Sequence, residues 1–263
     1  MRKSLLALLL LSLAVGPALA VEYEGLTLRV AAQYDMGAPV KDAPAVATVM
    51  YSNVTTFSGS GVLNGGAALQ GANTITRLTA DDLTPIGGGI DVTQFKFSVV
   101  NLNAVQLTFR PRARFWFADG AGGAPGTYYN LPAAVGFTFN PVTVGATSAT
   151  VFTAALGAGV MTMPTSTFWA GLTFDNNSGG TGATAAQLNN LGQGVFGPAD
   201  VGTSADQYFA TTGAGSFFGI ANPAGALGNF GGNPVADLGW EFSVDAPISV
   251  EPAVWSQVKA LYR

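Results

Sequence analysis

Residues 105–117, VQLTFRPRARFWF, decide the fold class. Apolar and polar side chains alternate along this stretch, which is typical of a β-strand with one buried face and one wet face. The apolar phase holds Val105, Leu107, Phe109, Ala113, Phe115 and Phe117, and the polar phase holds Gln106, Thr108, Arg110, Arg112, Arg114 and Trp116. Pro111 lies in the apolar phase and has no N–H, so we expect an edge position, a bulge or a break there.

Shorter runs of the same alternation recur along the chain, bounded by Gly, Pro, Asn or Asp. They are Leu26, Leu28 and Val30; Phe95, Phe97 and Val99; Phe137 and Phe139; Phe168, Ala170, Leu172 and Phe174; and Leu238, Trp240, Phe242 and Val244. Long helical patterns do not separate these runs, which argues against a parallel α/β fold. The sequence therefore predicts an all-β chain, an antiparallel β-sandwich of jelly-roll type with long Gly/Asn-rich loops, spanning residues 21–245 as one domain.

The stretch from residue 176 to residue 236 has a different texture, rich in Gly, Asn and Ala. Its strand patterning is weak, apart from a short strand expected near residues 207–211. Two similar segments begin at Asn222-Pro223 and Asn233-Pro234. They are interpreted as loops with the same turn chemistry, with a loop-borne binding or self-association surface as the alternative.

The first 20 residues have the features of a cleavable signal peptide. Arg2 and Lys3 supply the positive start, residues 5–15 are apolar, and Ala18-Leu19-Ala20 ends in a small-x-small pattern. The apolar run is too short for a bilayer span, which needs about 20 residues. We expect the chain to be exported through the inner membrane, to begin at Val21 after cleavage, and to be secreted or held at the cell surface without a transmembrane span.

Composition excludes several classes of site. The chain has no cysteine, so disulfides and a lipid-modified Cys are excluded and the fold depends on its apolar core. Removal of Arg2 and Lys3 leaves nine basic and 15 acidic residues, a formal charge of −6, which disfavours nucleic acid as a partner. The chain also lacks histidine, so Ser-His-Asp and Cys-His catalysis and the usual zinc sites cannot be built.

Residues 246–263 predict a linker followed by a short amphipathic helix. Pro252 suits the helix start, Lys259 and Arg263 suit its end, and one face is apolar. A helix of this length is marginal alone in water, so it needs a docking surface. That surface is the sandwich itself or, alternatively, sorting or assembly machinery, in which case Trp255 belongs to an assembly surface.

Carboxylates are the remaining candidates for chemistry. Paired acids are sufficient for glycoside hydrolysis, and the candidates are Asp81, Asp82, Asp119, Asp175 and Glu241. Turn or surface roles are the favoured interpretation of these residues. The same oxygens also suit calcium, with Asp175, Asn176 and Asn177 in one loop and Asp81 beside Asp82. A structural calcium is the one cofactor the sequence suggests.

Two sets of side chains are candidates for a ligand or assembly surface. Arg110, Arg112 and Arg114 repeat at about 7 Å, twice the strand rise. They are expected to pair with the chain's own carboxylates or, alternatively, to form a patch for an acidic polysaccharide or another subunit. Trp116 and Trp169 are either exposed platforms for sugar rings or covered by a second layer.

Four stretches carry a resemblance to a known group of proteins. They are Leu78-Thr-Ala-Asp-Asp-Leu-Thr84, Arg112-Ala-Arg-Phe-Trp-Phe-Ala-Asp-Gly120, Thr167-Phe-Trp-Ala-Gly-Leu-Thr-Phe-Asp-Asn176 and Phe230-Gly-Gly-Asn-Pro-Val-Ala-Asp-Leu-Gly-Trp-Glu-Phe242. The chain resembles, over about residues 49–244, uncharacterised exported bacterial proteins that often end in a PEP-CTERM-type sorting signal. The resemblance implies an extracellular or surface-attached β-sandwich without established catalytic residues. The sorting signal itself is not matched, because Val250-Glu251-Pro252 is not followed by an apolar span or an arginine cluster.

These observations favour one functional hypothesis and leave two alternatives. The favoured hypothesis is an exported, non-enzymatic structural protein of the cell surface or extracellular matrix that associates with itself or other surface proteins. The first alternative is a carbohydrate-binding module. The second, less favoured, is a carboxylate-dependent glycoside hydrolase.

Overall fold

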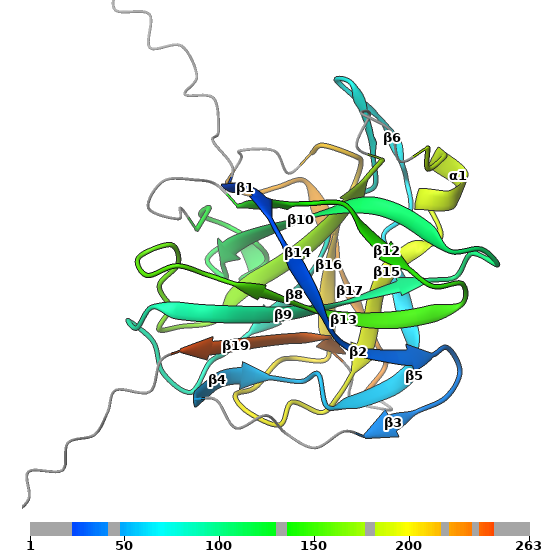
Figure 1. Cartoon of the computed structure of the whole chain (residues 1–263). Helices are drawn as coiled ribbons and strands as arrows, with labels where there is room; N and C mark the ends of the chain where they lie inside the picture. The colour runs from blue at the N-terminus through cyan, green and yellow to red at the C-terminus, as the bar shows by residue number, and fades with distance from the viewer. Residues whose placement is uncertain are drawn as a thin grey trace, which may run out of the picture.

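The structure is a computed structural model that describes residues 23–41, 48–129, 136–176, 182–216, 221–232 and 237–244. Two β-sheets pack face to face, with nearly all neighbouring strands antiparallel (Figure 1). The prediction of an all-β antiparallel sandwich is confirmed, and its jelly-roll type stays a prediction. The signal peptide over residues 1–20 and the C-terminal segment 246–263 with Trp255 lie outside the described residues.

The first sheet is built around the strand that the alternation of residues 105–117 predicts. Its order is β1 (Tyr23–Leu26), β11 (Phe137–Phe139), β10 (Leu107–Phe117), β14 (Phe168–Asp175), β8 (Thr79–Leu83), β16 (Gln207–Thr211) and β17 (Gly225–Asn229). β12 (Val142–Val144) also pairs with β10, and β7 (Asn73–Ile75) pairs with β14 and with β6 (Ala68–Gln70). Only β1 and β11 run parallel among these pairs. The short strand expected near residues 207–211 is confirmed as β16.

The second sheet covers the apolar face of the first. Its order is β2 (Leu28–Asp35), β13 (Ser148–Ala155), β9 (Val92–Asn101), β15 (Leu191–Phe196), β5 (Thr56–Leu63) and β3 (Val40–Lys41). β19 (Trp240–Val244) pairs with β9 and β4 (Thr48–Ser52), and β18 (Asp237–Leu238) pairs with β15. A 3-10 turn at Ala121–Gly123 and the one-turn helix α1 (Ala185–Leu188), capped by Thr184, complete the described elements. No helix in this described part is long and apolar enough to cross a bilayer.

Pro111 interrupts β10 less than the sequence suggests. The strand runs from Leu107 to Phe117 and keeps continuous register with β14 through Pro111. On its other side, β12 pairs with residues 107–109 and β11 with residues 112–113. The gap between these two ladders makes a local edge that accommodates a residue without an N–H. The expected edge character is therefore present, and the expected break into two strands is wrong.

An aromatic cluster fills the middle of the space between the sheets. Phe95 is fully buried and lies at its centre. The centroid of its ring lies 5.3–6.2 Å from those of Phe97, Phe115, Phe137, Phe139, Trp240 and Phe242. Aromatic pairs at these distances add to the stabilisation from buried area. This aromatic centre supplies the stability that a chain without disulfides requires.

The outer face of the first sheet is covered where β10 ends and β14 begins. Trp116 packs edge-on against Tyr128 with ring centroids 5.3 Å apart. Trp169 donates its indole N–H to the carbonyl of Gly123 at 2.8 Å. Both tryptophans are 0% exposed. The expectation of a wet face is wrong at this end of β10, where residues 118–129 fold back over the sheet. Arg110 and Arg112, farther along the same face, stay partly exposed.

Candidate functional site

The three arginines of β10 do not form an open basic patch. Asp175 on the neighbouring strand is buried and accepts hydrogen bonds from the Nε atoms of both Arg110 and Arg112, at 3.0 Å for Arg110. Arg114 is 0% exposed and donates to the carbonyls of Ala113 and Phe137. Pairing with the chain's own carboxylates is therefore confirmed for Arg110 and Arg112. The alternative of a three-arginine patch is wrong, because the fold buries Arg114 and pairs Arg110 and Arg112 with Asp175.

The predicted sugar platforms are also absent from the surface. Trp116 and Trp169 are 0% exposed, so neither ring can stack on a sugar from solvent. The alternative interpretation, coverage by a second layer, is confirmed for both.

The predicted calcium ligands near Asp175 are already engaged. The Asp175 carboxylate is held by two arginines, and Asn176 Oδ1 accepts the N–H of Thr74 at 3.0 Å. Asn177 lies outside the described residues. Over the parts of the chain that the structure covers, no group of three or more acidic side chains is arranged to hold a metal ion. Calcium binding at Asp81 and Asp82 stays a prediction.

Glu241, another candidate carboxylate, is buried and paired within the protein. It is 2% exposed, lies 2.7 Å from the ammonium of Lys96 and accepts the hydroxyl hydrogen of Ser52 at 2.9 Å. Removing Lys96 would leave the buried Glu241 carboxylate without its ion-pair partner.

Asp81 and Asp82 lie in the middle of β8 rather than in a turn. Asp81 points between the sheets, where its Oδ2 accepts the N–H of Leu238 at 2.6 Å. Asp237, the neighbour of that leucine on β18, is 1% exposed. Asp82 points to the other face and accepts the N–H of Ala205 at 3.3 Å. We call Asp81, Asp82 and Asp237 the acidic corner.

Burial perturbs every ionisable group of the acidic corner. Desolvation raises the pKa of Asp82 to about 6 and that of Asp237 to about 6. Burial also raises the pKa of Asp81, and the negative charges of Asp237 and Asp82 raise it further. Tyr51 on β4 faces the same carboxylates, and burial with the charge of Asp81 raises its pKa. The corner therefore takes up protons more readily than ordinary carboxylates do.

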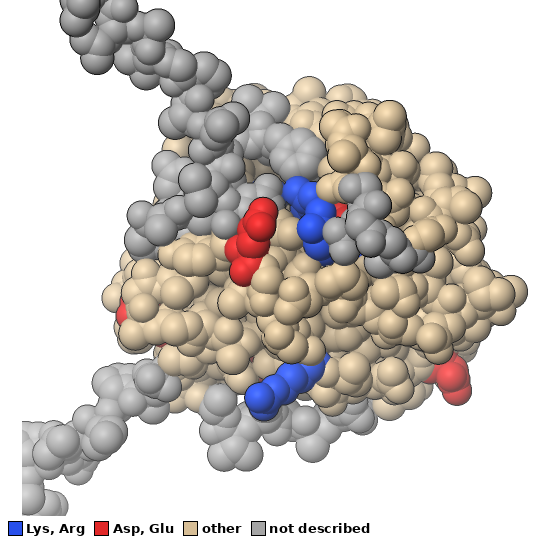
Figure 2. All heavy atoms as spheres, turned by 45° about the horizontal axis from the view of Figure 1, so that its top comes forward, with Lys and Arg blue, Asp and Glu red and all other residues tan. Residues whose placement is uncertain are grey.

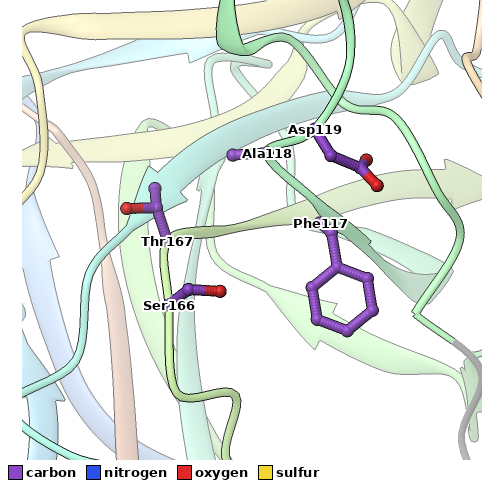
Figure 3. A pocket seen from close by; sticks show the side chains of 5 residues that line it. All are labelled: Phe117, Ala118, Asp119, Ser166 and Thr167. Atoms are coloured by element: carbon purple, nitrogen blue, oxygen red, sulfur yellow. The ribbon is translucent and has the colours of Figure 1, made fainter.

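A hollow of about 410 Å³ lies where β10 ends and β14 begins. It is lined by Phe117, Ala118, Asp119, Ser166 and Thr167 (Figure 3). The view shows the Phe117 ring, the Asp119 carboxylate and the Ser166 hydroxyl around the same space. Hydrogen bonds from Thr127 lower the pKa of Asp119, so its carboxylate is charged at neutral pH. The hollow therefore combines a partly exposed ring with charged and hydroxyl oxygens.

The strand β17 forms an uncovered end of the first sheet. Among the described residues it pairs only with β16, and four of its five residues are exposed. Its sequence, GALGN, contains no charge and no proline. Glycine is required at two positions, because a Cβ would lie 2.2 Å from the Phe209 ring at residue 225 and 2.3 Å from the Tyr208 ring at residue 228. We call β17 the open edge.

Comparison of the chain with protein-family models, curated proteins and solved structures gives no match. Functional inference therefore depends on the geometry of the acidic corner, the hollow and the open edge.

Sequence reasoning identified only some of these residues. Asp81, Asp82 and Asp119 were candidates from their chemistry, but Asp237 and Ser166 were not singled out. The segment that begins at Asn222 was interpreted as a loop, with a self-association surface as the alternative. The loop interpretation is wrong for residues 225–229, which form the strand β17. Phe117 is the last apolar-phase residue of β10. Its position at the end of the strand is the one sequence feature that could have indicated that its ring reaches the hollow. The GALGN stretch gives no signal, because glycine is depleted in strands.

Proposed function

We propose that this chain is an exported, non-enzymatic structural protein of the cell surface or extracellular matrix, whose copies join through the open edge β17. The observation that carries the proposal is the exposed, uncharged strand at the end of the first sheet. Such a strand presents unpaired N–H and C=O groups, which template pairing with another chain. The signal-like residues 1–20 support export.

The other three strands at the ends of the two main strand orders carry features that oppose pairing between chains. β1 contains Glu24 and a register shift between Glu24 and Leu26. β2 contains Arg29 and Asp35, and its register with β13 shifts opposite Val151 and Phe152. β3 has only two residues, Val40 and Lys41. Charges, bulges and short length are the known devices against edge-to-edge association, and β17 has neither a charge nor a register shift.

A second copy of the chain is the partner that this edge fits. Antiparallel pairing of β17 with β17 places the same five residues on both sides of a two-fold axis, and such an interface is complementary to itself. Main-chain hydrogen bonds would supply affinity, and the small side chains allow close approach. Only 10% of the residues are charged, and charged side chains are sparse on the face shown in Figure 2. This contact alone gives a dimer, and growth into a layer requires a second surface.

Sedimentation of the mature chain over a range of concentrations tests the proposal. We expect a dimer that Leu227→Lys abolishes, since Leu227 is 41% exposed on the open edge and a lysine there penalises pairing. The matched control is Val30→Lys, which places the same charge at a 55% exposed position of the terminal strand β2. A monomer at every concentration, or a dimer equally weakened by both substitutions, would overturn the proposal.

A further inference from the structure

The hollow at the end of β10 has a wall that is built in advance. Asp119 Oδ1 accepts the N–H of Thr127, which closes the loop over residues 119–127. Gly126 makes this closure feasible, because a Cβ at that position would lie 2.0 Å from Asp119 Oδ1. The bond from the Trp169 indole to Gly123 anchors the same loop to the sheet. The carboxylate is thus held in place before any ligand arrives.

The opposite wall is anchored as firmly. Thr167 and Thr84 share a hydroxyl–hydroxyl hydrogen bond of 2.7 Å. The backbone of Met163 bonds to Ile90 and Gly89, and a Cβ at Gly88 would lie 2.3 Å from the carbonyl oxygen of Pro164. Residues 162–167 therefore pack directly on residues 88–90. This arrangement holds the Ser166 hydroxyl at the rim.

The Phe117 ring forms the floor between these walls. It is partly buried and packs edge-on against Tyr129, with ring centroids 5.2 Å apart. Tyr129 in turn donates its hydroxyl hydrogen to the carbonyl of Thr162. The ring is therefore fixed by its neighbour while part of its surface stays open to the hollow.

We propose that this hollow binds one residue of a neutral oligosaccharide, with the sugar ring on Phe117 and its hydroxyls on Asp119 and Ser166. A charged carboxylate accepts hydrogen bonds from two neighbouring hydroxyls, and a hydroxyl side chain both donates and accepts. The volume of about 410 Å³ falls within the range of small-ligand sites. The negative charge of Asp119 disfavours an anionic ligand, and the single aromatic ring is too little surface for a large apolar one.

A second hollow has a similar lining but offers no exposed aromatic ring. It measures about 210 Å³ and is lined by Gln33, Tyr34, Asp35, Gly145 and Ser148. It also combines an aromatic residue, a carboxylate and a hydroxyl. However, Tyr34 is only 7% exposed, because its ring stacks on Phe57 with centroids 5.1 Å apart. No ring face is available there, so this hollow serves as the matched control.

Calorimetric titration with neutral oligosaccharides of glucose, galactose, mannose and N-acetylglucosamine tests the proposal. The Leu227→Lys chain is used, so that failure of self-association does not affect the result. We expect at least one series to bind. Asp119→Asn keeps an acceptor for Thr127 and should weaken binding about 10-fold, and Ser166→Ala about 3-fold, from the usual free energies of such hydrogen bonds.

The controls Asp35→Asn and Ser148→Ala should leave the affinity unchanged. Backbone amide shifts of residues 117–119 should move on titration, which locates the ligand independently of any substitution. The proposal is overturned if no neutral oligosaccharide binds at millimolar concentration. It is also overturned if Asp119→Asn and Ser166→Ala leave binding unchanged. A third contradicting outcome is binding of small ammonium compounds alone, which would show that the Asp119 carboxylate and the Phe117 ring form a site for cations.

Discussion

The aromatic centre and Asp81 of the acidic corner both lie between the sheets, yet they differ in what surrounds them. Phe95 and its aromatic neighbours exclude polar groups, so their contribution to stability does not depend on pH. The acidic corner buries Asp81 and Asp237 among other acids and one tyrosine. Its carboxylates reduce the free energy of unfolding when ionised and do so less when protonated. One region sets the stability of the fold, and the other makes that stability depend on acidity.

The position of the corner links it to the open edge. Asp81 lies opposite Tyr208 of β16, and β16 is the only described strand that holds β17. Repulsion among ionised carboxylates at the corner therefore acts beside the strand that supports the edge.

The largest change in the free energy of unfolding is expected from Phe95→Ala in the aromatic centre. It removes a fully buried ring from contact with six others, and such truncations cost about 3–5 kcal/mol. Urea unfolding monitored by tryptophan fluorescence measures the change. The loss should be the same at pH 5 and pH 7.5. A loss that depends strongly on pH would contradict the separation of the two regions.

A smaller effect is expected from pH itself. The pKa values of Asp82 and Asp237, about 6 in the folded chain, lie above the ordinary value of 3.8. The folded state therefore binds more protons than the unfolded state. The stabilisation is complete below about pH 3.8 and is lost as pH rises through about 6. Between pH 7.5 and pH 5 the two groups together should add about 2 kcal/mol to the free energy of unfolding.

Substitution isolates this contribution from that of the other acids. Asp82→Asn with Asp237→Asn should raise stability at pH 7.5 and flatten the profile between pH 5 and pH 7.5. Asp119→Asn, at a carboxyl whose pKa is lowered and which is fully exposed, should leave the slope in that range unchanged. Urea unfolding at several pH values gives both slopes. An unchanged slope in the double variant would refute the assignment to the corner.

The smallest effect is expected from Ser204→Ala. The Ser204 hydroxyl lies 3.5 Å from Asp81 Oδ1 and lowers the pKa of Asp237 by hydrogen bonding to its charged form. Its loss should cost about 0.5–1 kcal/mol at pH 7.5 and less at pH 5, where the carboxyls are protonated. Thermal unfolding at both pH values checks this difference. A larger loss at pH 5 would reverse the expected role of the hydroxyl.

The sequence predicted the half-apolar strands well because their alternation records burial directly. Phe168, Ala170, Leu172 and Phe174 face the core of the sandwich as expected. Strand β15 was missed, since its sequence LGQGVF is buried at all six positions and does not alternate. Periodicity fails for a strand that is covered on both faces.

The sites were less predictable, because they depend on contacts between distant segments. Arg114 and Trp116 have the sequence pattern of an exposed face, but both are buried, the tryptophan in a cluster that includes Tyr128 and Trp169. At the acidic corner, Asp81 accepts the backbone N–H of Leu238, which is 157 positions away in the sequence. No local spacing indicates that juxtaposition. The chemistry of Asp81 could be read from the chain, but its environment could not.

Amide hydrogen exchange of residues 225–229, followed as protein concentration rises, tests assembly through the open edge most directly. We expect amides of β17 to become protected as copies pair, while those of β2 keep a constant rate of exchange. Leu227→Lys should abolish the protection. Exchange in β17 that is independent of concentration, in a sample that sedimentation shows to be associated, would contradict pairing through this strand.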